Sequence, residues 1–247
     1  MISLTPDVVG KTTVTITINN KTFQVNINTL GVDVPNSLLL STKQKKQITV
    51  KGINGIKWNS SNSSVVSVSK NGTIYAKKTG NAVLIGTLGD LQLGCAVSVV
   101  TPARKRTVQK AVQIAKTCTY SQPKRMQEKF YDCSSLVWKS YHKNGVNFGM
   151  AYYAPVAADM GKWCVQHKKL VSGGPSQANI QNMKLNPGDV MFETGQKNGR
   201  YKGIYHVEMI TGYIFYGFDG NGKAELGIQW ATGDEKYYPM GQMVGRP

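Results

Sequence analysis

The chain has 247 residues, of which 40% are hydrophobic and 17% charged, so it is long enough for about two folded domains and is not disordered throughout. It contains no stretch of the roughly 18–20 apolar residues that a membrane-spanning helix needs, and Met1 to Gly10 lacks the basic and apolar segments of a secretory signal. The net charge of +17, spread over both halves of the chain, predicts a polyanionic partner: a nucleic acid, an anionic membrane or an anionic bacterial wall.

Residues 1–30 are predicted to form a terminal β-hairpin. Apolar residues alternate with polar ones from Val14 to Ile18, and again from Phe23 to Ile27 after a turn at Asn19-Asn20. A similar pattern returns at residues 80–99, about 70 residues later, which indicates a weak internal repeat. We interpret the hairpin as what remains of a preceding domain of the same kind as the one that follows.

Residues 31–101 are predicted to form an all-β sandwich, because short strand-like segments are separated by Ser, Asn and Gly turns without helical periodicity. The segments are Gln47–Val50, Ile56–Trp58, Val65–Val68 and Thr73–Tyr75. Ile56–Asn62, Asn71–Ala76 and the following Thr79-Gly80 resemble the bacterial Ig-like domain of group 2. The resemblance implies a spacer or adhesive module, of the kind found on wall-associated and phage-tail proteins, with no enzymatic role.

The basic, proline-containing segment 102–106 is interpreted as a solvated linker, and residues 107–247 as a second domain. Helical periodicity begins there, and strand-like segments follow it. The expected helices are 107–118, Asp132 or Cys133 to Gly145, and Pro155–Gln166; the expected strands are Asp189–Glu193, Tyr205–Tyr216 and Glu225–Ala231. Helices followed by strands predict an α+β fold for this domain.

Cys133 is the candidate nucleophile. Asp132 is a suitable N-cap, so the thiol is expected at the start of the second predicted helix. The helix dipole favours thiolate over thiol there, and the free backbone N–H groups can stabilise an oxyanion. The other cysteines, Cys95, Cys118 and Cys164, lack zinc-site spacing and are expected to be small apolar residues of the core. No metal or other cofactor is expected.

His206 is the candidate base for this thiol. His142 lies too far along the same predicted helix, and His167 lies in a Lys-rich stretch, whereas His206 begins an apolar strand. Gln229, on the next predicted strand, is expected to reach the imidazole ring and hold its tautomer. The three residues would then form a Cys-His-polar triad.

Four motifs of the second half appear in the order found in the NlpC-like cell-wall cysteine peptidases and resemble theirs. They are Asp132–Val137, Leu185–Phe192, His206–Gly212, and Gln229 before Trp230-Ala231. The family usually has Gly where this chain has Ser135 and Glu208, and commonly His where it has Gln229. The resemblance implies a circularly permuted papain-like fold, and hydrolysis of peptidoglycan stem peptides, typically at the γ-D-glutamyl to diamino-acid bond.

Residues around this pair are candidates for substrate binding. Tyr120 matches a tyrosine that the family often places near the thiol, although the usual glycines after it are absent, and plain packing is the alternative. Asp132 and Ser134, with Ser135 beside them, could bind polar groups of the substrate or could cap the helix. Strand alternation puts Glu208 on the face of His206, where it is expected to raise the pKa of the histidine or to shape the substrate pocket.

The sequence therefore predicts a wall- or virion-associated, extracellular peptidoglycan endopeptidase that acts on stem peptides and contacts anionic wall polymers, with a phage tail or an upstream domain as a further candidate partner. A cysteine amidase that cuts the sugar–peptide junction is one alternative. A non-catalytic wall-binding module is another, favoured by the departures at Ser135, Glu208 and Gln229. Nucleic-acid binding is not expected, because no recognised motif accompanies the positive charge.

Overall fold

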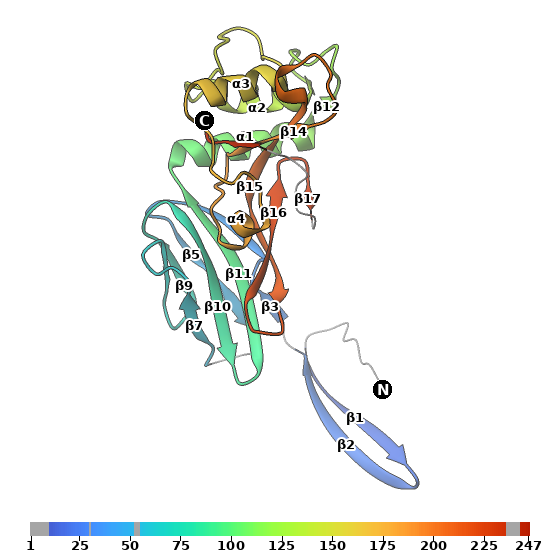
Figure 1. The fold of residues 1–247 in the computed structure, drawn as a ribbon. Coiled ribbons are helices and arrows are strands. Elements are labelled where there is room, and N and C mark those ends of the chain that lie inside the picture. Colours follow the sequence, from blue (N-terminus) through green and yellow to red (C-terminus); the bar gives the residue numbers. More distant parts are fainter. Residues whose placement is uncertain (1–9, 30, 52–54, 236–242) are drawn as a thin grey trace.

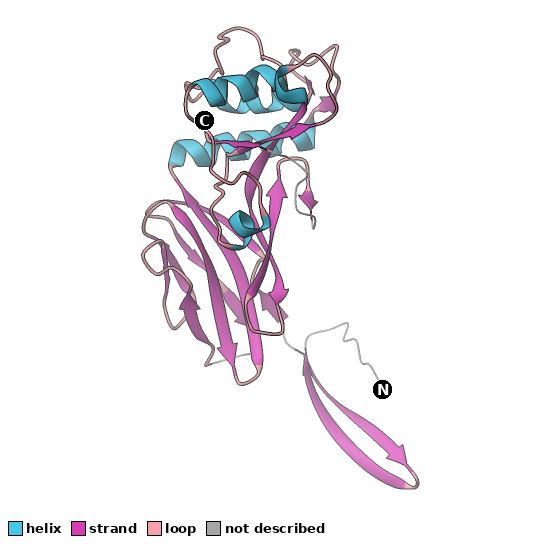
Figure 2. Cartoon of the chain, viewed as in Figure 1, coloured by secondary structure: helices cyan, strands magenta, loops and turns pink. Residues whose placement is uncertain are grey.

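The computed structural model describes residues 10–29, 31–51, 55–235 and 243–247 (Figure 1). Three parts follow one another: a separate hairpin, a β-rich unit, and a unit in which the helices of the chain gather at one end (Figure 2). None of the described helices is long and apolar enough to cross a membrane.

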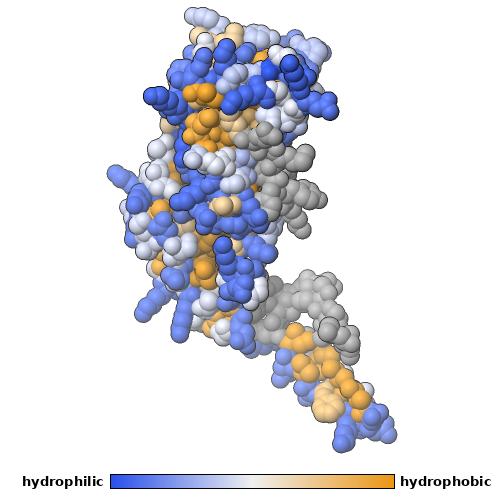
Figure 3. Space-filling model, viewed as in Figure 1, coloured by the Kyte–Doolittle hydropathy of each residue, from blue (hydrophilic) through white to orange (hydrophobic). Residues whose placement is uncertain are grey.

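The first part is the predicted hairpin, made of β1 (Gly10–Ile18) and β2 (Lys21–Thr29). Asn19 and Asn20 both have positive φ, 49° and 59°, as a tight two-residue hairpin turn requires. The hairpin projects from the rest of the molecule, and its apolar side chains form a patch on its surface (Figure 3). Ile18, Phe23 and Val25 are 58%, 53% and 45% exposed, so this apolar face is largely open to solvent.

The second part is a two-sheet sandwich, as the spacing of short strands predicts. One sheet has the strand order β4-β11-β10-β7 and the other β5-β9-β8, and β3 pairs with β6 beside them. The strands are β3 (Gly31–Asp33), β4 (Ser37–Ser41), β5 (Lys45–Gln47), β6 (Thr49–Lys51), β7 (Lys57–Ser60), β8 (Val66–Val68), β9 (Thr73–Ala76), β10 (Gly80–Leu88) and β11 (Leu91–Val100). Fully buried side chains between the sheets, such as Ile74, Leu84 and Val97, form the core.

The expected linker at residues 102–106 does not exist, because helix α1 (Pro102–Thr117) begins directly after β11. Thr101 is its N-cap, with a side chain that accepts a hydrogen bond from Arg104 N, and Pro102 occupies the first helical position, where a missing N–H costs nothing. The basic residues belong to the first turns of this helix: Arg104 and Lys105 are half-buried and hydrogen-bonded to Pro247 and Gln44, and Arg106 is exposed.

The third part is mixed α and β, as predicted. A five-stranded antiparallel sheet has the order β17-β16-β15-β14-β18, and helices α1, α2 and α3 pack against β15. The helices are α2 (Cys133–His142), α3 (Ala157–Gln166) and the short α4 (Gln177–Gln181). The sheet strands are β14 (Val190–Thr194), β15 (Ile204–Phe218), β16 (Ala224–Trp230), β17 (Asp234–Glu235) and β18 (Met243–Gly245); β12 (Thr119–Tyr120) pairs with β13 (Phe130–Tyr131), and a 3-10 turn covers Tyr201–Gly203.

The second and third parts share a hydrophobic core. Strands β10 and β11 present one face to the sandwich core and the other to β15 and β16, where Val83 and Ala96 pack in one cluster with Tyr213 and Ile228. The approach is close at Gly94: a Cβ there would lie 2.3 Å from the ring of Phe215. The sandwich is therefore joined to the third part by packing as well as by the chain.

Candidate active site

Cys133 is the first residue of α2, as the sequence predicts. Asp132 and Ser135 form a reciprocal capping box: the Asp132 Oδ1 atom accepts from Ser135 N at 2.7 Å, and Ser135 Oγ accepts from Asp132 N at 2.8 Å. A capped helix start fixes the direction of its first residue and leaves the N–H groups of the first turn without helical partners. The half-buried, free thiol of Cys133 therefore lies at the positive end of the helix dipole.

A buried arginine supports this helix start. Arg125 Nη1 lies 2.9 Å from Asp132 Oδ2 and 2.9 Å from Ser134 Oγ, and its Nη2 donates to the backbone oxygen of Ala154. Hydrogen bonds from Ser135 and Arg125, together with the charge of Arg125, outweigh burial and hold the pKa of Asp132 below its usual value. No sequence motif identifies Arg125. Its role becomes apparent only in the structure, where it is 8% exposed and hydrogen-bonded to Asp132 and Ser134.

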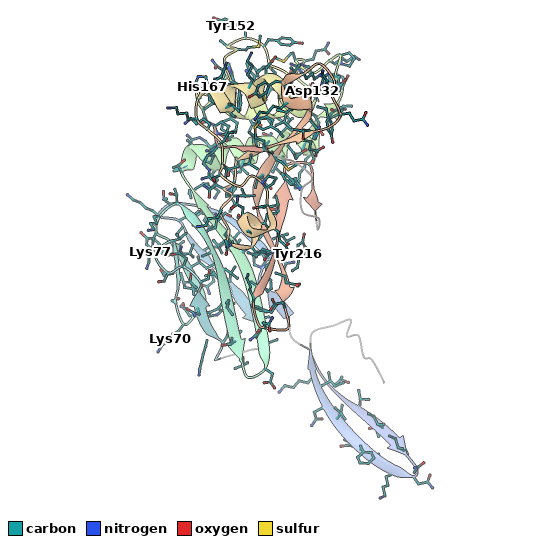
Figure 4. All side chains as sticks on the ribbon, viewed as in Figure 1. Lys70, Lys77, Asp132, Tyr152, His167 and Tyr216 are labelled. Carbon is teal, nitrogen blue, oxygen red and sulfur yellow. The ribbon has the colours of Figure 1, made fainter. Side chains whose placement is uncertain are left out.

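The expectation that Asp132, Ser134 and Ser135 bind substrate is not supported by this geometry. All three side chains are buried, and their polar atoms are engaged with one another or with Arg125. Of the two roles that the sequence left open for Asp132 and Ser134, the structure places both in the cap of α2 (Figure 4, where Asp132 is labelled).

His206 and Cys133 are brought together from separate elements. His206 lies near the start of β15, and its ring lies beside the Cys133 side chain. Interaction with the Cys133 side chain, and then with Glu208, raises the pKa of His206 from 6.5 to about 10, against the opposing effect of burial. The ring is therefore held as an imidazolium at neutral pH.

Glu208 is the polar group that contacts the imidazole. His206 Nε2 lies 3.4 Å from Glu208 Oε2, because residues two apart on a strand share a face. The sequence expectation that Glu208 faces His206 and raises its pKa is confirmed. The carboxylate is only 14% exposed, so solvent screens this contact less than it screens a surface ion pair.

The prediction that Gln229 reaches the His206 ring is wrong. The register of β15 and β16 sets Gln229 opposite Gly212, six residues beyond His206 and so about 20 Å along the strand. The Gln229 side chain instead accepts a hydrogen bond from Ser37 of β4 at 3.3 Å. A register shift between Ile210 and Gly212 adds to the offset, and the sequence pattern shows no sign of it.

Tyr120 lies beside the nucleophile. Its hydroxyl lies close to the backbone of Cys133, and its ring meets that of Tyr131 edge-to-face at 5.5 Å. Burial of the hydroxyl, and then the nearby sulfur of Cys133, raise the pKa of Tyr120. The ring is half exposed, so the phenol stands at the mouth of the site instead of packing in the core.

A cavity of about 470 Å³ opens beside His206. It is lined by Met191, Glu193, His206, Glu208, Trp230, Thr232 and Gly233. Two carboxylates and a tryptophan thus border the candidate base, on the side of β14 and the turn after β16. The other two histidines are engaged elsewhere: His142 stacks on Trp138 and His167 on Trp163.

The remaining cysteines have no part in the site. Cys95 and Cys164 are buried, and burial raises the pKa of each to about 12, whereas Cys118 is half-buried. Among the described residues, no group of three or more His, Cys, Asp or Glu side chains is placed to hold a metal ion.

Comparison with known proteins defines the class of the β-rich unit. Residues 34–99 match the family described as the bacterial Ig-like domain (group 2), so this part of the chain is a bacterial Ig-like domain, as its motifs predict. No curated protein matches the chain.

Solved structures similar to the chain include a GH10 xylanase from termite gut that contains a bacterial Ig-like domain. It is 22% identical, with a TM-score of 0.25, and the match covers 26% of this chain and 18% of the xylanase. Domains 4 and 5 of the S-layer protein SbsC are 18% identical, with a TM-score of 0.24, over 40% of this chain and 62% of that one. An intimin mutant of EHEC O157:H7 is 12% identical, with a TM-score of 0.23, and the match covers 87% of this chain and 84% of the intimin chain.

Proposed function

We propose that the chain is a cysteine peptidase that hydrolyses peptidoglycan stem peptides. The single observation that supports it most is the placement of His206 beside the Cys133 side chain, which is the largest cause that raises the pKa of His206 to about 10. A thiol at a helix start, beside an imidazolium, is the arrangement that makes a cysteine nucleophilic at neutral pH. The resemblance of four sequence motifs to those of the NlpC-like peptidases supports the choice of substrate, and with it a papain-like arrangement of the helices and sheet.

The reaction would begin at the ion pair. The Cys133 thiolate attacks the scissile carbonyl, and the carbonyl electrons move to oxygen in a tetrahedral intermediate. His206 then gives its proton to the leaving amine, the C–N bond breaks, and a thioester remains. The now neutral His206 takes a proton from water, the hydroxide attacks the thioester, and the acid product leaves as the thiolate re-forms.

The side chains around the pair have complementary tasks in this scheme. Glu208 orients the imidazole and stabilises its charged form, which is the part expected of the third residue of a triad. The backbone N–H of Cys133 and the hydroxyl of Tyr120, which lie in contact, are the groups at the helix start that can donate to the developing oxyanion. Arg125 holds Asp132, and so the helix start, in place.

The Ig-like unit fits a supporting task. Its contacts with β15 and β16 place it against the sheet that bears His206, so it would hold the catalytic unit at a fixed distance from whatever its outer surface binds. We assign it a spacer or wall-binding role outside the chemical step, in a protein that acts at the cell wall or from a virion.

Digestion of defined muropeptides tests the proposal. Wild type, Cys133→Ala and Cys133→Ser are incubated with disaccharide tetrapeptides, and the products are identified by mass spectrometry. The endopeptidase releases a peptide and leaves a dipeptide on the sugar, whereas an amidase would leave bare sugar. Turnover that survives in Cys133→Ala contradicts the nucleophile; wild type that binds walls without any turnover leaves the non-catalytic module as the function.

A further inference from the structure

A basic groove runs between α1 and α2, apart from the candidate active site. Its volume is about 440 Å³, and it is lined by Arg106, Gln109, Lys110, Gln113, Lys139, Ser140, Lys143 and Asn144. The residues from α1 follow helical spacing and form one stripe. Asn144 Nδ2 donates to Thr107 Oγ1 at 2.6 Å, which ties the end of α2 to the start of α1 and sets the two helices antiparallel along the groove.

The charges in this groove are of one sign. Four of its eight described lining residues are Lys or Arg, and none of the eight is acidic. Within the described residues, the ion pairs involve Arg125, His206 and Arg246, none of which lines the groove. Positive charge that is gathered in a concave surface, without acidic partners among the described residues, attracts an anion that comes from outside.

The individual cations differ in how available they are. Lys139 is committed to the fold, because its Nζ donates to the backbone oxygens of Gln127 and Phe130. Burial is the largest cause that lowers the pKa of Lys139; the charges of Cys118 and Asp132 oppose it, and those of Arg125 and Lys110 add to it. Arg106, Lys110 and Lys143 are exposed. Lys110 Nζ donates to Gln113 Oε1 at 3.3 Å within the groove, a neutral partner that leaves its charge available to an anionic ligand.

We propose that this groove binds a polyol-phosphate chain, the chemistry of bacterial wall teichoic acids. Phosphates spaced along such a chain pair with the exposed cations. The amide of Gln109, and the NH2 group of Gln113, whose oxygen already accepts from Lys110, can hydrogen-bond polyol hydroxyls. None of the described residues that line the groove is aromatic. Base stacking, which contributes much of the affinity of proteins for single-stranded nucleic acid, therefore has no platform among them.

The groove and Cys133, the candidate nucleophile, both lie on helix α2. Cys133 begins α2, and Lys139 and Lys143 follow on the same helix, about 9 and 15 Å further along its axis. A polymer in the groove would therefore hold the wall next to the site. The inference rests on the proposed function for the choice of a wall polymer, but binding in the groove does not depend on catalysis.

The test measures binding of purified poly(glycerol phosphate) to the full chain, with Cys133→Ala as the background so that turnover plays no part. Lys110→Gln with Lys143→Gln removes two groove charges. Lys70→Gln with Lys78→Gln removes two exposed charges of the Ig-like unit instead (Figure 4 labels Lys70), and the net charge falls equally. Thermal melting checks that both double variants are folded.

The groove double variant is expected to bind between about twofold and thirtyfold more weakly at 0.1 M salt. The slope of log K against log salt should fall by about 1.4, which is roughly 0.7 for each phosphate that the protein no longer neutralises. The control variant should retain wild-type affinity within about twofold. Equal weakening in the two variants, or no binding by the parent protein, overturns the proposal. Tighter binding of single-stranded DNA of equal charge overturns the choice of polymer.

Discussion

Substitution of Glu208 by Gln tests whether this carboxylate sets the charge state of His206, the candidate base. The His206 Nε2 to Glu208 Oε2 distance is 3.4 Å, and the two side chains are 30% and 14% exposed. A hydrogen bond between charged groups contributes about 1.5–3 kcal/mol. Since one pKa unit corresponds to about 1.4 kcal/mol, the neutral amide should lower the pKa of His206 by about 1–2 units.

The sign of the effect follows from the proton that His206 must donate. Its pKa is raised to about 10, so the imidazolium persists at neutral pH and is lost as the pH rises through that value. The alkaline limb of kcat/KM should therefore lie near pH 10 in the wild type and about 1–2 pH units lower in Glu208→Gln. Because the two groups titrate together, the limb belongs to the Cys133–His206 pair.

The assay is a pH series of muropeptide hydrolysis between pH 6 and about pH 11, with stability checked at each pH. Glu193→Gln is the matched control. Glu193 lies opposite His206 across β14 and β15 and lines the same cavity, but it hydrogen-bonds Tyr205 instead. An alkaline limb that does not move in Glu208→Gln, or that moves equally in both variants, refutes the assigned task of Glu208.

Three further predictions test other parts of the structure. Gln229→Ala should change kcat/KM by less than about threefold, because its side chain contacts the Ig-like unit; a muropeptide assay checks it. Arg125→Met should lower the free energy of unfolding by about 3–5 kcal/mol, since it leaves Asp132 buried without its ion pair; urea denaturation measures this. In the same assay, Val97→Ala should lower the free energy of unfolding by roughly 2–3 kcal/mol, because Val97 is fully buried. Val25→Ala should lower it by less than about 0.5 kcal/mol, because Val25 lies on the exposed face of the hairpin.

The pair at the candidate site could be predicted from sequence because each member has a local signature. Asp132 before Cys133 signals a helix start, and His206 before an apolar run signals a strand end. Glu208 followed from the period of two along that strand. All three inferences depend on short-range geometry, which the order of residues determines directly.

The contacts of Gln229 and Arg125 could not be predicted in this way, because they depend on long-range geometry. The place of Gln229 depends on which residues of β15 and β16 pair, and a register shift near Gly212 changes that pairing. The partners of Arg125 are fixed by the path of the loop before α2, which has no periodicity. The prediction of a linker at residues 102–106 is wrong for another reason. Their charges suggest a solvated segment, but Thr101 and Pro102 are equally good signals for the start of a helix.

The packing of the Ig-like unit on the five-stranded sheet could also be predicted from the sequence, by comparing two hairpins. Strands β1–β2 and β10–β11 have the same pairing register, offset by 70 residues: Gly10 pairs with Thr29, and Gly80 with Val99. One face is apolar in both hairpins. The other face differs, as the following equivalent positions show: Thr13, Thr15, Gln24 and Asn26 in the first hairpin against Val83, Ile85, Gly94 and Ala96 in the second.

A strand pair is expected to have apolar residues on both of its faces only where a second layer covers its outer face. In this chain β15 and β16 cover the outer face of β10–β11, and the polar outer face of β1–β2 is exposed. The same backbone unit thus has both faces largely exposed in β1–β2 and both faces buried in β10–β11, where it meets the third part of the chain. Because Val83 and Ala96 contribute to the core that supports β15, the strand that bears His206, the stability of the Ig-like unit and the geometry of the candidate site are coupled through packing.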